Sequence, residues 1–347
     1  MKRRRSGSSG PFRHWHWCSD PGAGTQRKIT HKATKRSTSP GHRARAAGLG
    51  NNDTVLTVGL LVVAVLLTWP VPRLLPRLTL LEHVPGATLL LWQAVALSAI
   101  FAAVSLAPMA ILQTVRHGRE IPAPAANYPM LAIGLVISGL VIARLLLQGH
   151  RIGRDLRIAR REHAELVDLL GVSPDPEGGD ESITVLAHPT PTAYCIPGRR
   201  HRVVLTDSTI RSLPADELSA VLAHERAHLR LRHDLVLEFF TVLHTTVPPA
   251  IRSDLALREV RLLIEALADE SACRAVGPVP VARALLQLAG ANHPGATLGM
   301  AGAAQRRMEL LGDTDAHRGL ATAVATAAVL VLCVTGCLAW GALLGLA

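Results

Sequence analysis

The segment from Leu222 to Asp234, LAHERAHLRLRHD, carries histidine and glutamate side chains at a spacing that can hold a metal ion. His224 and His228 are four residues apart, so on an α-helix their imidazoles lie one turn apart on one face and can bind one ion together. Glu225 lies beside His224, where its carboxylate reaches a water molecule next to the ion rather than the ion itself. This H-E-x-x-H pattern predicts two zinc ligands and a general base for hydrolysis.

A catalytic zinc usually has three protein ligands, so a further one is expected downstream. Residues 258–275, REVRLLIEALADESACRA, carry Glu265 and Asp269 one helical turn apart. Glu265 is the predicted third ligand, and Asp269 is predicted to accept a hydrogen bond from the outer nitrogen of a ligand histidine. A solvated helix face, with Glu259, Glu265 and Glu270 in water, explains this segment taken alone, but together with the first motif a zinc site is favoured.

Two amphipathic helices would position these groups. The first is predicted over residues 212–234, with Pro214 near its first turn, and the second over residues 258–275. Apolar residues recur at helical spacing in both. They are Leu218, Val221, Leu222 and Leu229 in the first helix, and Val260, Leu263, Ile264 and Leu267 in the second.

A third histidine in the first motif, His233, is predicted not to be a ligand. It follows His228 by five residues, which on one continuous helix turns it away from the face of His224 and His228. His233 is therefore assigned to the surface together with Arg230 and Arg232.

Hydrophobic residues make up 49% of the 347 residues, and the mean hydropathy is +0.27, a balance that favours membrane spans. Each of four apolar runs can cross the roughly 30 Å hydrocarbon layer as a helix. They occupy residues 55–72, 87–115, 130–148 and 320–346. Pro108 predicts a kink or an early end in the second run. We therefore expect a mainly α fold, with transmembrane helices at 54–148 and 320–346 and an α+β domain at 149–319.

The formal net charge of +11 is concentrated in two places. One is the tail at residues 1–53, whose Ser-, Gly- and Pro-rich basic composition predicts disorder. The other flanks the folded domain, with arginines after the third span and before the fourth: Arg151, Arg154, Arg157, Arg160, Arg161, Arg306, Arg307 and Arg318. Arginines next to spans stay on the cytoplasmic side, so the domain is predicted to be cytoplasmic in a multi-pass protein of the cell membrane.

The basic tail breaks the same rule, because three spans place it across the membrane from the domain. It is either an upstream start-site artefact, with the true start near Val55, or a basic arm whose RHWHW at Arg13–Trp17 mixes aromatic and charged side chains. Direct nucleic-acid binding is not expected, because no helix-turn-helix, RRM or zinc-finger pattern is visible. The expected partners are the lipid bilayer and a protein substrate.

HERAH followed by EALAD resembles the H-E-x-x-H and E-x-x-x-D pair of gluzincin peptidases. The layout, with three spans before the domain and one after it, is similar to that of BlaR-type antirepressor integral-membrane metallopeptidases, relatives of the HtpX and CAAX prenyl protease group. The segment PTAYCIPGRRHRVVLTDSTIRSLPADELSAVLAHERAH extends the likeness to most of residues 180–275. The resemblance implies one catalytic zinc with His224, His228 and Glu265 as ligands, Glu225 as the catalytic base and Asp269 as the partner of a ligand.

The resemblance also implies how a substrate binds. The strand from Ala193 to Ile196, with Tyr194 and Cys195, would be the edge along which an extended substrate adds itself as a further strand. Arg274 and Tyr194 are the two candidates for stabilising the oxyanion, and the sequence does not rank them. The implied substrate is a cytoplasmic winged-helix repressor of the BlaI type. Membrane-protein quality control of the HtpX type and non-catalytic signal transduction are the alternatives.

Overall fold

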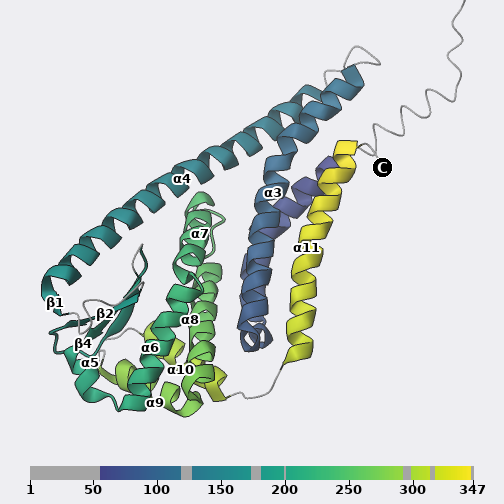
Figure 1. Ribbon diagram of the computed structural model, residues 1–347. Coiled ribbons are helices and arrows are strands. Elements are labelled where there is room, and N and C mark those ends of the chain that lie inside the picture. Colours follow the sequence, from purple (N-terminus) through teal and green to yellow (C-terminus); the bar gives the residue numbers. More distant parts are fainter. Residues whose placement is uncertain are drawn as a thin grey trace, which may run out of the picture. The chain divides into compact units, whose positions relative to one another are not determined.

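The computed structural model describes six parts of the chain: residues 55–118, 127–172, 181–198, 201–291, 298–312 and 317–344. The basic tail predicted for residues 1–53 lies outside them. The described parts are mainly helical and carry one four-stranded sheet (Figure 1). The expectation of a mainly α fold is confirmed.

Among the described residues, four helical segments are long and apolar enough to cross a membrane: Val55–Arg77, Pro85–Val115, Leu131–Leu170 and Arg318–Gly341. Each overlaps one of the apolar runs found in the sequence. The first consists of a helix at residues 55–68, α2 (Val71–Leu74) and the 3₁₀ helix η1 (Leu75–Arg77). The others belong to α3 (Pro85–Gly118), α4 (Asn127–Leu170) and α11 (Arg318–Leu344). This pattern indicates a membrane protein.

Pro108 lies inside α3, which nevertheless continues to Gly118. Ser138 of α4 binds the backbone at this point: its hydroxyl donates to the carbonyl of Ala103 at 2.8 Å and accepts from the N–H of Ala107 at 3.0 Å. A neighbouring helix that supplies such contacts makes a proline tolerable within the bilayer, where water cannot reach unpaired backbone groups. The second span therefore does not end at Pro108.

The connection between the first two spans contains the 3₁₀ helix η2 (Thr79–His83). Its Leu81 is buried with Val324 of α11, and the Leu81 carbonyl accepts a hydrogen bond from the hydroxyl of Thr88 in α3 at 2.7 Å. These contacts fix the connection against α11 and α3.

The sheet has the strand order β1-β2-β4-β3. β1 (Gly171–Val172) is antiparallel to β2 (Glu181–Leu186), β2 is parallel to β4 (His201–Thr206), and β3 (Ala193–Ile196) is antiparallel to β4. β3 is thus an outer strand. Side chains alternate along β4, so Val203 and Leu205 pack against the helices of the domain while Val204 packs with Val167 of α4.

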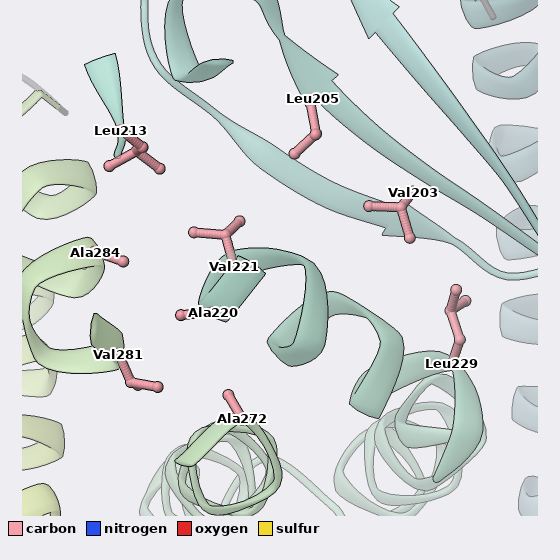
Figure 2. Packing of buried hydrophobic residues seen from close by; sticks show 9 residues of the cluster. All are labelled: Val203, Leu205, Leu213, Ala220, Val221, Leu229, Ala272, Val281 and Ala284. Carbon is pink, nitrogen blue, oxygen red and sulfur yellow. The ribbon is translucent and has the colours of Figure 1, made fainter. Parts of the chain in front are cut away.

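Between the sheet and α11, the described residues form six helices: α5 (Asp207–Ser212), α6 (Ala215–Arg230), α7 (His233–Thr246), α8 (Asp254–Val276), α9 (Pro278–Ala291) and α10 (Leu298–Gly312). Val203 and Leu205 meet α6, α8 and α9 in one hydrophobic cluster. Figure 2 shows Val221 of α6 pointing toward the strands, while Ala272 of α8 lies on the opposite side of α6. Because α6 is held between the sheet and α8, its rotation about its own axis is fixed.

The domain helices α7 and α8 also pack against the second span. Leu89 and Trp92 of α3 are buried together with Phe240 of α7 and with Val260 and Leu263 of α8. The helix that carries Glu265 is therefore packed against a candidate membrane span as well as against α6.

Candidate metal centre

The predicted ligands come from α6 and α8, which pack against each other. Nε2 of His224 lies 3.1 Å from Nε2 of His228 and 3.4 Å from Oε2 of Glu265. Nε2 of His228 lies 3.7 Å from Oε1 of Glu265. One donor atom from each residue lies within 4.8 Å of the other two. The structure thus brings the three residues of the predicted site together.

Each imidazole has a partner at its outer nitrogen Nδ1, which directs the inner nitrogen Nε2 toward the other imidazole and toward Glu265. Nδ1 of His224 lies 2.9 Å from Oδ1 of Asp269 and donates to it, so the neutral ring carries its lone pair on Nε2. Burial lowers the pKa of His228 to about 4, so this ring is neutral near pH 7 and also offers a lone pair. Two imidazole nitrogens and a carboxylate form the donor set of a catalytic zinc, so the residues present fit this metal.

Negative charge surrounds these nitrogens. Burial by itself lowers the pKa of His224, but hydrogen bonds with Asp269 and Glu265 outweigh burial and raise this pKa to about 9. The charge of Glu225 acts in the same direction. The carboxylates therefore favour a positive charge at this point, whether it is a proton or a metal ion.

Arg307 of α10 is a further member of the site, which the sequence had placed only among the arginines before the fourth span. Its guanidinium donates two hydrogen bonds to Asp269, at 2.7 and 2.6 Å, and lies 3.1 Å from Oε2 of Glu265. Burial by itself raises the pKa of both carboxyls, but His224 and Arg307 outweigh it and hold both pKa values below their usual range. His224 and Arg307 thus keep Asp269 ionised although Asp269 is only 3% exposed.

His233 does not lie at the surface, and that prediction is wrong. The first helix is not continuous: α6 ends at Arg230, and Arg232 adopts a left-handed conformation with φ of 52° before α7 begins at His233. This turn buries His233, which is 2% exposed, and brings its Nδ1 to 3.0 Å from Nδ1 of His228. His233 is therefore the outer partner of His228, as Asp269 is the outer partner of His224.

Glu225, the predicted base, faces the strand β3. The thiol of Cys195 is hydrogen-bonded to the carboxylate of Glu225. Burial and then the charge of Glu225 raise the pKa of Cys195 to about 12, so the thiol stays protonated and is the donor. Burial also raises the pKa of Glu225 above its ordinary value.

The remaining predicted residues belong to β3 and α8. Ala193 packs beside Cys195 against the cluster of β4 and the domain helices. Tyr194 points to the other face of β3, where it packs with Val167 and its hydroxyl lies 3.0 Å from Nε2 of His163. Arg274 lies at the surface, with its guanidinium 3.3 Å from the carboxylate of Glu270. The structure does not bring Tyr194 or Arg274 to the zinc ligands, and their oxyanion role stays a prediction.

A comparison with protein families agrees with this geometry. The model of peptidase family M48 matches residues 159–332, which include every residue of the site described above. The chain belongs to this family, whose members are metallopeptidases and are generally zinc-dependent. No curated protein and no solved structure matches the chain.

Proposed function

We propose that this protein is an integral-membrane, zinc-dependent endopeptidase. The observation that supports this most directly is the meeting of His224, His228 and Glu265 with Glu225 beside them. Membership of family M48 supports hydrolysis of peptide bonds, and the four apolar helices support work at a bilayer.

Glu225 is the residue that moves the proton in this proposal. Burial raises its pKa, so the carboxylate accepts a proton from the attacking water more readily than an ordinary glutamate does. As the water oxygen bonds to the carbonyl carbon, a proton passes to a carboxylate oxygen of Glu225. Glu225 then gives that proton to the amide nitrogen as the C–N bond breaks. A zinc ion held by His224, His228 and Glu265 would supply Lewis acidity, which polarises the substrate carbonyl and acidifies water.

The strand β3 offers a place for an extended substrate. It pairs with β4 on one side, and its Cys195 contacts the base Glu225. A peptide that added itself to the free side of β3 would therefore pass the base. Its backbone hydrogen bonds would provide affinity with little preference for particular side chains.

For the substrate we propose a cytoplasmic repressor of the winged-helix, BlaI-like type. The arginines that flank the domain support a cytoplasmic orientation, and the resemblance of the motifs and span order to antirepressor peptidases supports a repressor. A second candidate is a membrane-protein substrate, as in HtpX-type quality control. The packing of α8 against Leu89 and Trp92 of the second span favours it, because that packing ties the ligand helix to the bilayer.

The peptidase proposal is tested with pure protein in detergent. Glu225→Gln should retain zinc and lose casein or peptide cleavage, whereas His224→Ala should lose the zinc itself. Glu270→Gln is the matched control, because Glu270 is an exposed glutamate on the same helix as Glu265. Cleavage by Glu225→Gln at the wild-type rate would refute the mechanism. Zinc binding without any cleavage by the wild type would favour a non-catalytic signal transducer.

The two substrate classes differ in cells that express only Glu225→Gln. A repressor substrate should accumulate intact and silence its target genes, while a quality-control role should leave misfolded membrane proteins to accumulate. Unchanged repressor levels and target transcription under cell-wall stress would exclude the repressor.

A further inference from the structure

Two neighbouring arginines on α10 make separate ion pairs with carboxylates from different parts of the chain. Arg307 binds Asp269 and Glu265 at the metal centre. Arg306 binds Glu82 through two hydrogen bonds, Nε to Oε2 at 2.7 Å and Nη2 to Oε1 at 2.8 Å. Adjacent residues on a helix point about 100° apart, so the two pairs hold α10 from two directions.

Glu82 belongs to the connection between the first two membrane spans and not to the peptidase domain. It is only 5% exposed, which is rare for a glutamate unless it is paired. The residues around it are fixed as well, since Leu81 is buried against α11 and accepts a hydrogen bond from Thr88. Glu82 is therefore an immobile carboxylate that presents both oxygens to α10.

We propose that Glu82 is a positioning residue for the metal centre, which acts through Arg306 to fix α10 and so holds Arg307 against Asp269 and Glu265. This inference rests on the proposed zinc site. A bidentate arginine–carboxylate pair fixes the direction of both groups, so the Glu82 pair sets the rotation and height of α10. Arg307 then reaches two carboxylates of α8 at once. The membrane part of the chain thereby helps to build the zinc site.

The expected loss of zinc affinity depends on how many side-chain contacts separate each residue from the metal ion. Loss of a group that hydrogen-bonds a metal ligand or its partner typically weakens metal binding by roughly 10- to 100-fold, and Arg307→Ala should fall in that range. Glu82 acts one step further away. Glu82→Gln should therefore weaken zinc binding by about three- to tenfold.

The test is a double-mutant cycle in full-length protein purified in detergent micelles, with zinc affinity measured by competition with a chromophoric chelator. The proteins are wild type, Glu82→Gln, Arg307→Ala and the double variant. If Glu82 acts through Arg307, Glu82→Gln should have no further effect once Arg307 is replaced. A residue that only stabilises the fold would instead weaken binding by the same factor in both backgrounds.

Glu259→Gln is the matched control, because Glu259 is a partly buried carboxylate on α8 that feels the charges of Glu82 and Arg306, and within the described part of the chain it forms no ion pair with the metal ligands. It should bind zinc as the wild type does. If Glu82→Gln fails to fold, Arg306→Gln breaks the same pair from the side of α10 and takes its place in the cycle.

Unchanged zinc affinity in Glu82→Gln, or effects that multiply in the double variant, would overturn this inference and leave the peptidase proposal intact. A wild-type protein that binds no zinc would overturn both.

Discussion

Asp269→Asn should weaken zinc binding by about 10- to 100-fold, which corresponds to about 1.4 to 2.7 kcal/mol, without emptying the site. The side chain keeps its size, but one of its two acceptor oxygens becomes an amide donor. Asp269 accepts from His224 at 2.9 Å and from Arg307 at 2.7 and 2.6 Å, so all of its partners are donors. The amide must therefore face either an imidazole N–H or a guanidinium N–H.

Each choice has a cost that can be measured. An amide that opposes Nδ1 of His224 disfavours the tautomer that keeps Nε2 free, and this lowers zinc affinity. An amide that opposes Arg307 leaves a buried cation with Glu265 as its remaining carboxylate partner, and this lowers the stability of the metal-free protein by about 1 to 3 kcal/mol.

Chelator competition measures the first effect, and denaturant unfolding of the metal-free protein measures the second. Asp254→Asn is the matched control, because Asp254 lies on the same helix but is 71% exposed and pairs with His244. An exposed pair of this kind contributes about 0 to 1 kcal/mol, so the control should bind zinc normally. Zinc affinity in Asp269→Asn equal to that of the control would refute the assignment of Asp269 as the partner of a ligand.

Two further predictions concern stability and topology. Burial, followed by the charge of Glu82, raises the pKa of Glu259 from 4.5 to about 7, so ionising Glu259 destabilises the fold increasingly from pH 4.5 to 7. In urea unfolding, Glu259→Gln should therefore have the same free energy of unfolding as the wild type at pH 4.5. Above pH 7 its free energy of unfolding should be higher by about 1 to 2 kcal/mol, less than the full pKa shift implies because water screens a partly exposed group. An equal gain at both pH values would contradict this. A phosphatase reporter that is active only outside the cytoplasm should be silent when fused after Arg161 and active when fused after Ala347, and the reverse pattern would mean that the basic tail, not the domain, follows the positive-inside rule.

The parts of the molecule that the sequence predicted well depend on short-range periodicity. Hydropathy over about twenty residues is a local property, and it located all four candidate spans. The ligand set is nearly as local, because His224 and His228 share one helix and Glu265 and Asp269 share another. Neither helix pattern by itself predicts that the two helices touch. That contact is predicted by the motif, because ligands from both helices must bind one ion.

The parts that the sequence missed depend on long-range packing or on an unmarked turn. Arg307 is 38 residues from Asp269, and no periodic relation links them. The break between α6 and α7 occurs at Arg232, which adopts the left-handed conformation that usually favours glycine or asparagine. Because position 232 is neither glycine nor asparagine, the sequence predicts a continuous helix, and this wrongly places His233 at the surface.

The three carboxylates of the centre differ in the role that their surroundings allow. Asp269 and Glu265 touch both His224 and Arg307, and these positive or donating groups outweigh burial and hold their pKa values low. Among the described residues, Arg307 forms no hydrogen bond with Glu225, and burial raises the pKa of Glu225. Environments that push the pKa values of neighbouring acids apart separate their tasks. Asp269 and Glu265 are therefore suited to orienting a histidine and binding a cation, and Glu225 is the carboxylate best suited to taking up a proton.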